Sequence, residues 1–157
     1  MARKRDFDPV VARNRKARFR FEIVETCECG IVLTGSEVKS LRDRQVSLDE
    51  AYARIYDEQV WLIGCHIAPY PHAGKHNHDP DRKRKLLLHK SEVRKIIPKL
   101  KLKGFTLVPL EIHFNARSIA KVTLGLAVGR ATRDKRQTLQ NREAKREIER
   151  ALKRRRK

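Results

Sequence analysis

The sequence predicts a mainly β protein: an antiparallel β-barrel with two or three short helices and a basic, disordered tail at each end. Two observations carry this prediction. Between residues 18 and 128, short stretches alternate apolar and polar side chains, which is the pattern of half-buried strands. Outside this region the chain is dense in Lys and Arg and poor in the apolar residues that a core needs.

The positive charge is concentrated at the two ends of the chain. The 157 residues carry a net charge of +19, of which residues 1–20 contribute +6 and residues 129–157 contribute +9. Blocks of like charge indicate a polyanionic partner, and nucleic acid is the usual one. An acidic membrane surface is the rival partner, and a merely soluble basic surface is the alternative without any partner.

The compartment is indicated by what the sequence contains and lacks. Residues 1–18 begin with positive charge but have no apolar h-region, and no apolar run has the length of a membrane span. Three Cys, an odd number, suit a reducing compartment better than a disulfide framework. We therefore expect a cytoplasmic protein without a membrane partner.

The first elements are expected before residue 44. Residues 18–25 alternate apolar and polar side chains, so they predict a half-buried strand. A second strand beginning at Gly30 is expected to pair back on the first. Ser36 is a candidate N-cap, and it predicts a short helix over the residues that follow.

The middle of the chain predicts a pair of strands followed by a long loop. Residues 51–68 form two strands joined by a turn at Asp57–Gln59. The candidate inward positions of these strands are Ala53, Ile55, Val60 and Leu62. Residues 69–85 are rich in Pro, Asn, Asp and His, which predicts a loop of the kind that is often functional or disordered.

The last structured elements are a helix and the clearest hairpin. Ser91 caps a helix in which Pro98 should introduce a kink or an end. Residues 105–114 and 120–129 alternate strongly and predict a hairpin, with Pro109 at an edge or a bulge.

These elements add up to six or seven antiparallel strands and two short helices. They fit a small closed or nearly closed barrel of the OB type, a fold that commonly binds oligonucleotides through one face and its loops. The predicted organisation is a basic N-terminal arm over residues 1–17, an OB-like barrel over 18–128, and a basic C-terminal tail over 129–157.

Chemical sites are sparse in the sequence. The cluster Arg82–Lys85 precedes the apolar residues 86–88 and could neutralise phosphates, although a solvated loop has the same composition. Cys and His residues could supply metal ligands, but their spacings match no standard zinc module, so no metal is expected. No catalytic motif occurs, so no enzyme is expected, and a ribonuclease that uses His residues is the open alternative.

The tail favours a helix that depends on a partner. Residues 141–154 place a narrow apolar stripe beside pairs of opposite charge at helical spacing. The members of the stripe are Ala144, Ile148, Ala151 and Leu152. An isolated helix of this length is marginal in water, and the stripe is too thin for membrane insertion. We expect the tail to fold against a phosphate-bearing partner, with docking on its own barrel as the alternative.

Five stretches between about Asn14 and Leu152 follow one another in a characteristic order: "NRKARFRFEIVE", "GIVLTGSEVKSLR", "HDPDRKRKLLLHK", "GFTLVPLEIHF" and "DKRQTLQNREAKREIERAL". In these stretches the chain resembles the SsrA-binding protein family, also called small protein B. The resemblance implies an OB-like fold and a monomeric adaptor without cofactor or catalysis. It further implies two partners: tmRNA, bound through its tRNA-like domain, and the stalled ribosome. There the tail enters the empty decoding centre and mRNA channel, so that the nascent chain is tagged for degradation and the ribosome is released.

The resemblance also assigns roles to residues. Asn14, Glu28 and Leu87 match positions that the family uses to bind tmRNA. The full set expected to contact tmRNA is Asn14, Arg15, Lys16, Arg18, Glu28, Glu37, Lys39, Lys83, Arg84, Lys85 and Leu87. The set expected at the decoding centre and mRNA channel is Gly129, Arg130, Arg133, Asp134, Lys135, Arg136, Arg142, Lys145 and Arg146.

Two departures from the family pattern lie at the root of the tail. Arg130 and Ala131 stand where the family usually has two Lys, and Arg133 stands where it often has a His or Tyr able to stack on a base. A guanidinium plane can also stack on a base, so the role could be kept. A structural ribosomal protein, whose basic ends fill crevices in rRNA, is the competing interpretation of the whole chain.

Overall fold

Three long strands organise the fold. The computed structural model describes residues 9–130, 143 and 145–146 of the chain. Within it, β8 (Phe105–Phe114) and β9 (Ala120–Gly129) form an antiparallel hairpin. β2 (Phe21–Ile31) pairs with the other edge of β9 over almost its whole length.

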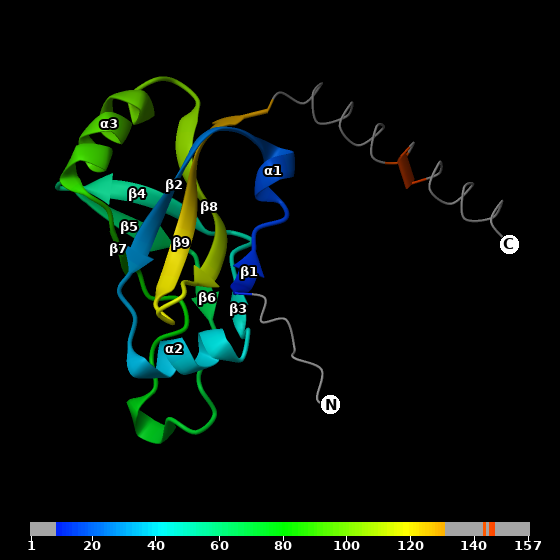
Figure 1. Cartoon of the computed structure of the whole chain (residues 1–157), viewed down its shortest axis with the longest axis vertical. Helices are drawn as coiled ribbons and strands as arrows, with labels where there is room; N and C mark the ends of the chain where they lie inside the picture. Colours follow the sequence, from blue (N-terminus) through cyan, green and yellow to red (C-terminus); the bar gives the residue numbers. More distant parts are fainter. Residues whose placement is uncertain (1–8, 131–142, 144, 147–157) are drawn as a thin grey trace, which may run out of the picture.

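The remaining strands close a ring of pairings (Figure 1). β4 (Tyr52–Tyr56), β5 (Gln59–Ile63) and β7 (Arg84–Leu87) continue the sheet in the order β8-β4-β5-β7-β2-β9, and β8 also pairs with β9. Because the last pairing joins the two ends of this order, the six strands form a barrel, as predicted. β1 (Val10–Arg13) adds to β8 outside the ring.

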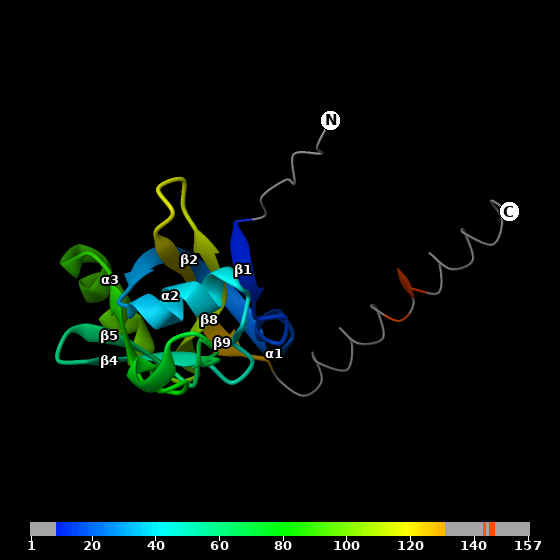
Figure 2. The ribbon, with the colours of Figure 1, turned by 90° about the horizontal axis from the view of Figure 1, so that it is seen from below.

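Short elements occupy the two ends of the barrel. α2 (Gly35–Arg42) lies across the lower end in Figure 1, close to the two-stranded sheet of β3 (Val46–Ser47) and β6 (His66–Ile67). Figure 2 shows this end from below, with α2 in front of the strands. α3 (Lys90–Leu100) lies at the upper end, and α1 (Ala17–Arg20) lies beside the end of β9. A 3-10 turn, η1 (Gly74–His76), lies in the long loop before β7.

Two apolar clusters hold these elements together. The larger one fills the barrel and includes Leu62, Ile112 and Leu124, each fully buried. The smaller one lies on the opposite side of the β8–β9 hairpin, where α1 covers the sheet. Its buried members are Ala17, Val108, Leu110 and Ala127. The second cluster is what keeps α1, a helix of only four residues, in a fixed place.

Several sequence predictions are confirmed. The hairpin spans the predicted residues, and the sheet register shifts at Pro109, where a bulge was expected. Asp57 and Glu58 form the turn between β4 and β5, both with positive φ. Of the four candidate inward positions, Ala53, Val60 and Leu62 are buried and Ile55 is half-buried against the core.

The prediction for the first strands was wrong in two places. Ala17–Arg20 are helical, so the strand begins at Phe21 and not at Arg18. The strand then continues through Gly30 without a turn, because β9 offers a partner along its full length. A bulge between Ile23 and Glu25 changes which side chains face the core, so the alternation of the sequence does not continue as an alternation of burial.

Both helix caps were placed two residues too late. α2 is capped by Thr34 and α3 by His89, and each cap forms a capping box with a Glu three residues on, Glu37 and Glu92. Pro98 lies inside α3, and the helix ends two residues after it.

The predicted N-terminal arm was too long. Residues 1–8 lie outside the described residues, but Val10–Arg13 form β1 and pair with β8. The greater part of the predicted tail also lies outside the described residues. Within the part of the chain that is described, no helix is long and apolar enough to cross a membrane.

Gly64 provides a test of the fold. Its φ is +73°, and a Cβ built on it would lie 2.7 Å from the backbone oxygen of Glu50. Gly64→Ala should therefore lower the free energy of unfolding by about 1–3 kcal/mol, measured by urea denaturation. Gly35, which has open space around its Cβ position and a φ outside the positive region, is the matched control. Equal stability of the two Ala variants would contradict the strain at Gly64.

Candidate nucleic-acid interface

Asn14 fixes the corner between β1 and α1. Its Oδ1 accepts a hydrogen bond from the backbone N–H of Ala17 at 3.0 Å, and its Nδ2 donates to the carbonyl of Leu48 at 3.0 Å. The residue is 6% exposed, and its backbone N–H donates to Leu110 at 2.7 Å. Since its amide is used inside the protein, Asn14 positions its neighbours, and the direct contact with RNA predicted for it does not fit this geometry.

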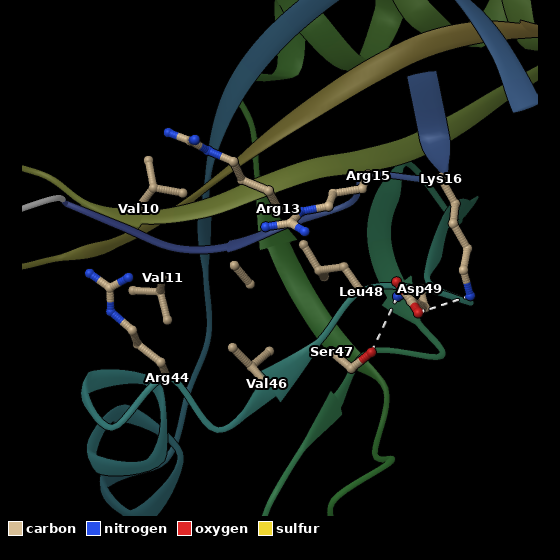
Figure 3. A pocket seen from close by; sticks show the side chains of 11 residues that line it. Val10, Val11, Arg13, Arg15, Lys16, Arg44, Val46, Ser47, Leu48 and Asp49 are labelled. Carbon is tan, nitrogen blue, oxygen red and sulfur yellow. Dashed lines mark hydrogen bonds and ion pairs between the residues drawn. The ribbon is translucent and has the colours of Figure 1, made fainter. Parts of the chain in front are cut away.

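The neighbours of Asn14 form the rim of a groove of about 520 Å³ (Figure 3). Val11 and Val46 point toward each other across it, and Arg13 and Arg15 lie along its upper side. Lys16 lies at one end, where its Nζ is 2.9 Å from a carboxylate oxygen of Asp49. The groove is therefore apolar within, with Arg13 and Arg15 on one side and Arg44 on the other.

A second groove of about 520 Å³ lies around the other side of the same corner. Arg13 and Arg15 also line this groove, together with Arg18. Its remaining lining comes from Asn14 and from strand residues. These are Thr26, Leu110, Glu111 and Thr123. The predicted residues Arg15 and Arg18 are thus brought together, whereas Arg13 was missed by the sequence analysis.

The second groove opens onto a polar surface that we call the Glu28 face, made of Thr26, Glu28, Leu87, Glu111, His113 and Thr123. Glu28 is paired with Thr123, and Thr123 with Glu111. Leu87 is paired with Gly30, two residues from Glu28, and remains 52% exposed. Gly30 permits this approach, since a Cβ there would lie 3.3 Å from the Cβ of Leu87. Glu28 and Leu87 therefore share one face with the arginine-lined groove.

His113 holds the carboxylate of Glu28. Its Nε2 lies 3.0 Å from Glu28 Oε2, and its Nδ1 lies 3.9 Å from Glu111 Oε1. With the proton on Nε2, the imidazole donates to Glu28 and leaves the other carboxylate oxygen free to accept from a ligand. The sequence analysis missed His113, because only the register of β2, β9 and β8 brings the two residues together.

A buried carboxylate organises the lower end of the barrel. Glu37 is fully buried and accepts four hydrogen bonds, one of them from the backbone N–H of Thr34 at 2.7 Å. Arg82 donates two, from Nε at 2.8 Å and Nη2 at 2.6 Å, and Arg84 donates one from Nε at 2.8 Å. α2, the long loop and β7 are joined at this one group.

Arg84 is enclosed by the protein. It is fully buried, and its Nη atoms donate to the carbonyls of Cys65, Arg82 and Pro80. Neither Glu37 nor Arg84 exposes its side chain, so this structure does not support the RNA contacts predicted for them, and both side chains act as internal supports. The outward positions of β7 are Lys85, which is half-buried, and Leu87, which is exposed. Lys83, directly before the strand, is also exposed.

The long loop is ordered by the same region. His78 is buried, with Nδ1 2.9 Å from Ser36 Oγ and Nε2 3.0 Å from the carbonyl of Ile67. Asn77 exchanges two side-chain hydrogen bonds with the backbone of Tyr70. Lys39 lies 5.2 Å from the ring centroid of Tyr70, so this predicted RNA contact is at the loop, away from Arg15 and Arg18.

The thiols of Cys29 and Cys65 are buried and pack within the protein. Burial raises the pKa of Cys29 to about 12 and that of Cys65 to about 11, so both thiols stay protonated near neutral pH. Among the described residues, no group of three or more His, Cys, Asp or Glu is arranged to hold a metal ion.

Comparison with known proteins identifies the family. The SmpB protein family model matches residues 11–154. An SsrA-binding protein of Symbiobacterium thermophilum is 51% identical over 97% of this chain and 96% of that protein, and one of Chloroflexus aggregans is 52% identical over 99% and 98%. A solved structure described as "tmRNA-SmpB: a journey to the center of the bacterial ribosome" has a chain 52% identical to this one, with a TM-score of 0.66. The match covers 79% of this chain and 86% of that one.

This chain belongs to the SmpB family. The SmpB match extends from β1 into the basic tail. At the root of the tail, Gly129 ends β9, and the backbone N–H of Arg130 donates to the carbonyl of Arg20 at 3.1 Å, beside α1. Lys145 and Arg146 are exposed and helical. The other predicted decoding-centre residues lie outside the described residues: Arg133, Asp134, Lys135, Arg136 and Arg142.

Glu37→Gln tests the buried network. Burial raises the pKa of Glu37, but the hydrogen bonds from Arg82 and Thr34 and the attraction of Arg84 outweigh it and hold the pKa below its usual value. The ionised carboxylate thus stabilises the fold above the pKa of an unfolded Glu, and this stabilisation is lost as pH falls through the lower pKa of the folded state.

Removing this charge should lower the free energy of unfolding at pH 7 by about 3–5 kcal/mol, because Arg84 is left buried without its partner. Urea denaturation at pH 7 and in acid measures both effects, and the variant should also lose part of the acid sensitivity. Asp81→Asn, at the exposed pair with His66, is the control and should change stability little. A Glu37→Gln variant as stable as Asp81→Asn would refute the role given to the network.

Proposed function

We propose that the protein is an RNA-binding adaptor of trans-translation that works in the cytoplasm as a monomer, without a cofactor or catalysis of its own. It binds the tRNA-like domain of tmRNA with its body and delivers the RNA to ribosomes stalled on mRNA. Its tail enters the empty decoding centre and mRNA channel, so that the nascent chain is tagged and the ribosome is released. The observation that carries the proposal is the Glu28 face beside the arginine-lined groove, in a chain of the SmpB family.

The two parts of the RNA surface act in different ways. Arg15 and Arg18 are exposed at the groove and would neutralise phosphates, which gives affinity without dependence on sequence. The carboxylate of Glu28 repels phosphate, because both groups are negatively charged. A fixed carboxylate accepts hydrogen bonds from base amino groups or from 2′-hydroxyls, and either contact distinguishes a particular RNA structure. The exposed Leu87 offers an apolar surface next to it.

The other predicted residues have supporting or separate roles. Asn14, Glu37 and Arg84 hold the elements that present the surface. Lys83, directly before β7, and Lys85 on β7 add positive charge beside Leu87, whereas Lys16 is partly neutralised by Asp49. Lys39 lies with the long loop, where it would meet a different part of the RNA or of the ribosome.

We propose that the ribosome stabilises the helix of the tail. Its sequence combines helical pairing of charges with too few apolar residues for a core, so an RNA template would provide what it lacks. Gly129 and Arg130, at the beginning of the tail, are held beside α1 by the hydrogen bond from Arg130 to Arg20. A channel already filled by mRNA would exclude the tail, which makes its engagement conditional on a stalled ribosome.

Glu28→Gln tests the specific part of the surface. Gln keeps the size of the side chain but replaces one acceptor oxygen by a donor, so the affinity for tmRNA should fall about 5- to 150-fold, from a loss of roughly 1–3 kcal/mol. Filter binding or fluorescence anisotropy with labelled tmRNA measures it.

The control is Glu22→Gln on the same strand. Glu22 is exposed, and its neighbour Ile23 packs in the outer cluster, so Glu22 points the other way. Both substitutions change the net charge equally. If they weakened tmRNA binding equally, the effect would be electrostatic, and the role proposed for Glu28 would be wrong.

A further inference from the structure

The β4–β5 hairpin carries exposed aromatic side chains on its solvent side. Tyr52, Arg54 and Tyr56 alternate with core residues along β4, so all three point outward. Trp61 is directly opposite Arg54 on β5, and Lys85 is directly opposite Trp61 on β7. We call these five residues the aromatic face. They include none of the residues assigned above to tmRNA except Lys85.

The side chains of the aromatic face have a defined arrangement, in which a cation lies beside the aromatic rings. The Cζ of Arg54 lies 5.4 Å from the ring centroid of Tyr52. Tyr56 is the next outward residue of β4 after Arg54, so Arg54 separates the two rings along the strand. Tyr52 is 37% and Tyr56 47% exposed, so both rings keep surface available for a ligand.

Charge on this side of the barrel favours an anion. Arg54 and Lys85 belong to the aromatic face, and Lys101 lines a neighbouring groove with Arg54. Asp57 and Glu58 lie at the turn beyond Tyr56. At the other end of β4, Asp49 and Glu50 line a pocket with Tyr52, but both carboxylates are paired with Lys16 or Arg20. A polyanion would therefore cross the strands on the Tyr52 and Trp61 side of that turn.

The aromatic face is continuous with the Glu28 face. Lys85 and Leu87 are two residues apart on β7 and point to the same side, and Leu87 borders Gly30 on β2. An RNA chain leaving the Glu28 face across β7 would reach Lys85 and then Trp61.

From this arrangement we propose that the aromatic face binds unpaired nucleotides of RNA. Successive outward residues on a strand are about 6.7 Å apart, so Tyr52 and Tyr56 are separated by twice this distance. Bases stacked in a strand are about 3.4 Å apart. The two rings therefore fit bases that are splayed from a single strand, and they do not fit a continuous stack. Aromatic side chains interleaved with cations are the usual means of holding single strands.

This inference goes beyond the proposed function and does not depend on it, because its test uses a short RNA. Trp61 is the single Trp of the chain, so its fluorescence reports on this surface directly. The full chain is titrated with an oligoadenylate of about eight nucleotides, within the site sizes of OB-folds. The single strand should quench Trp61 fluorescence, whereas a blunt duplex of equal length, whose bases are already stacked, should not.

Variants separate stacking from charge. Tyr52→Thr and Tyr56→Thr keep β propensity but remove the ring, and each should weaken oligoadenylate binding about tenfold. Tyr52→Phe and Tyr56→Phe keep the ring and should bind nearly as the natural chain does. Arg54→Gln should keep the quenching but lower the slope of log affinity against log salt by about 1. Unchanged thermal unfolding of each variant shows that it is folded.

Two further titrations identify the source of the unpaired nucleotides. The double Thr variant and the natural chain are compared for binding to tmRNA and to vacant small ribosomal subunits. If the double Thr variant loses affinity for tmRNA alone, or for the subunits alone, the proposal is supported and that partner is the source of the unpaired nucleotides. The proposal would be overturned if the double Thr variant bound both tmRNA and the subunits as tightly as the natural chain does. Equal quenching by single strand and duplex would also overturn it, as would oligoadenylate binding that the Thr variants leave unchanged. None of these results would bear on Glu28→Gln.

Discussion

The ion pair between Glu37 and its two arginines is the interaction on which the lower end of the structure depends. A carboxylate without solvent contact is costly, and here four hydrogen bonds compensate it. The same bonds connect α2 to β7 and fix the loop between them, which would otherwise have little apolar material to order it. A long loop rich in Pro and His thus becomes a fixed part of the barrel.

This anchoring determines what β7 presents to solvent. With Arg84 and Leu86 held inward, Lys85 and Leu87 must point outward, and Leu87 settles against Gly30 of β2. Asn14 has the same function for α1, where it places Arg15 and Arg18 beside the groove. Two internal polar groups therefore align surfaces that come from distant parts of the sequence, and neither group needs to touch RNA.

The sequence predicted what depends on local pattern and missed what depends on contacts between distant residues. The hairpin of β8 and β9 and the turn at Asp57 and Glu58 follow from alternation and turn chemistry. α1 and β1 are too short to be detected without the sheet they pack on. Burial of Glu37 could not be predicted, although the T-x-x-E spacing from Thr34 was a visible capping signal. The Glu28 face required the register, and family resemblance alone had pointed to Glu28 and Leu87.

We propose that the body of the protein recognises specific groups of tmRNA in addition to phosphate charge. Binding of the full chain to tmRNA and to an elongator tRNA, across a salt series, tests it most directly. Phosphate contacts alone, at six to ten contacts, lose about 10³–10⁵ in affinity between 50 and 200 mM salt for both RNAs together. We predict that tmRNA keeps a large preference at the highest salt. If the two affinities were similar and fell in parallel, the protein would bind as a general polycation, and the claim would be wrong.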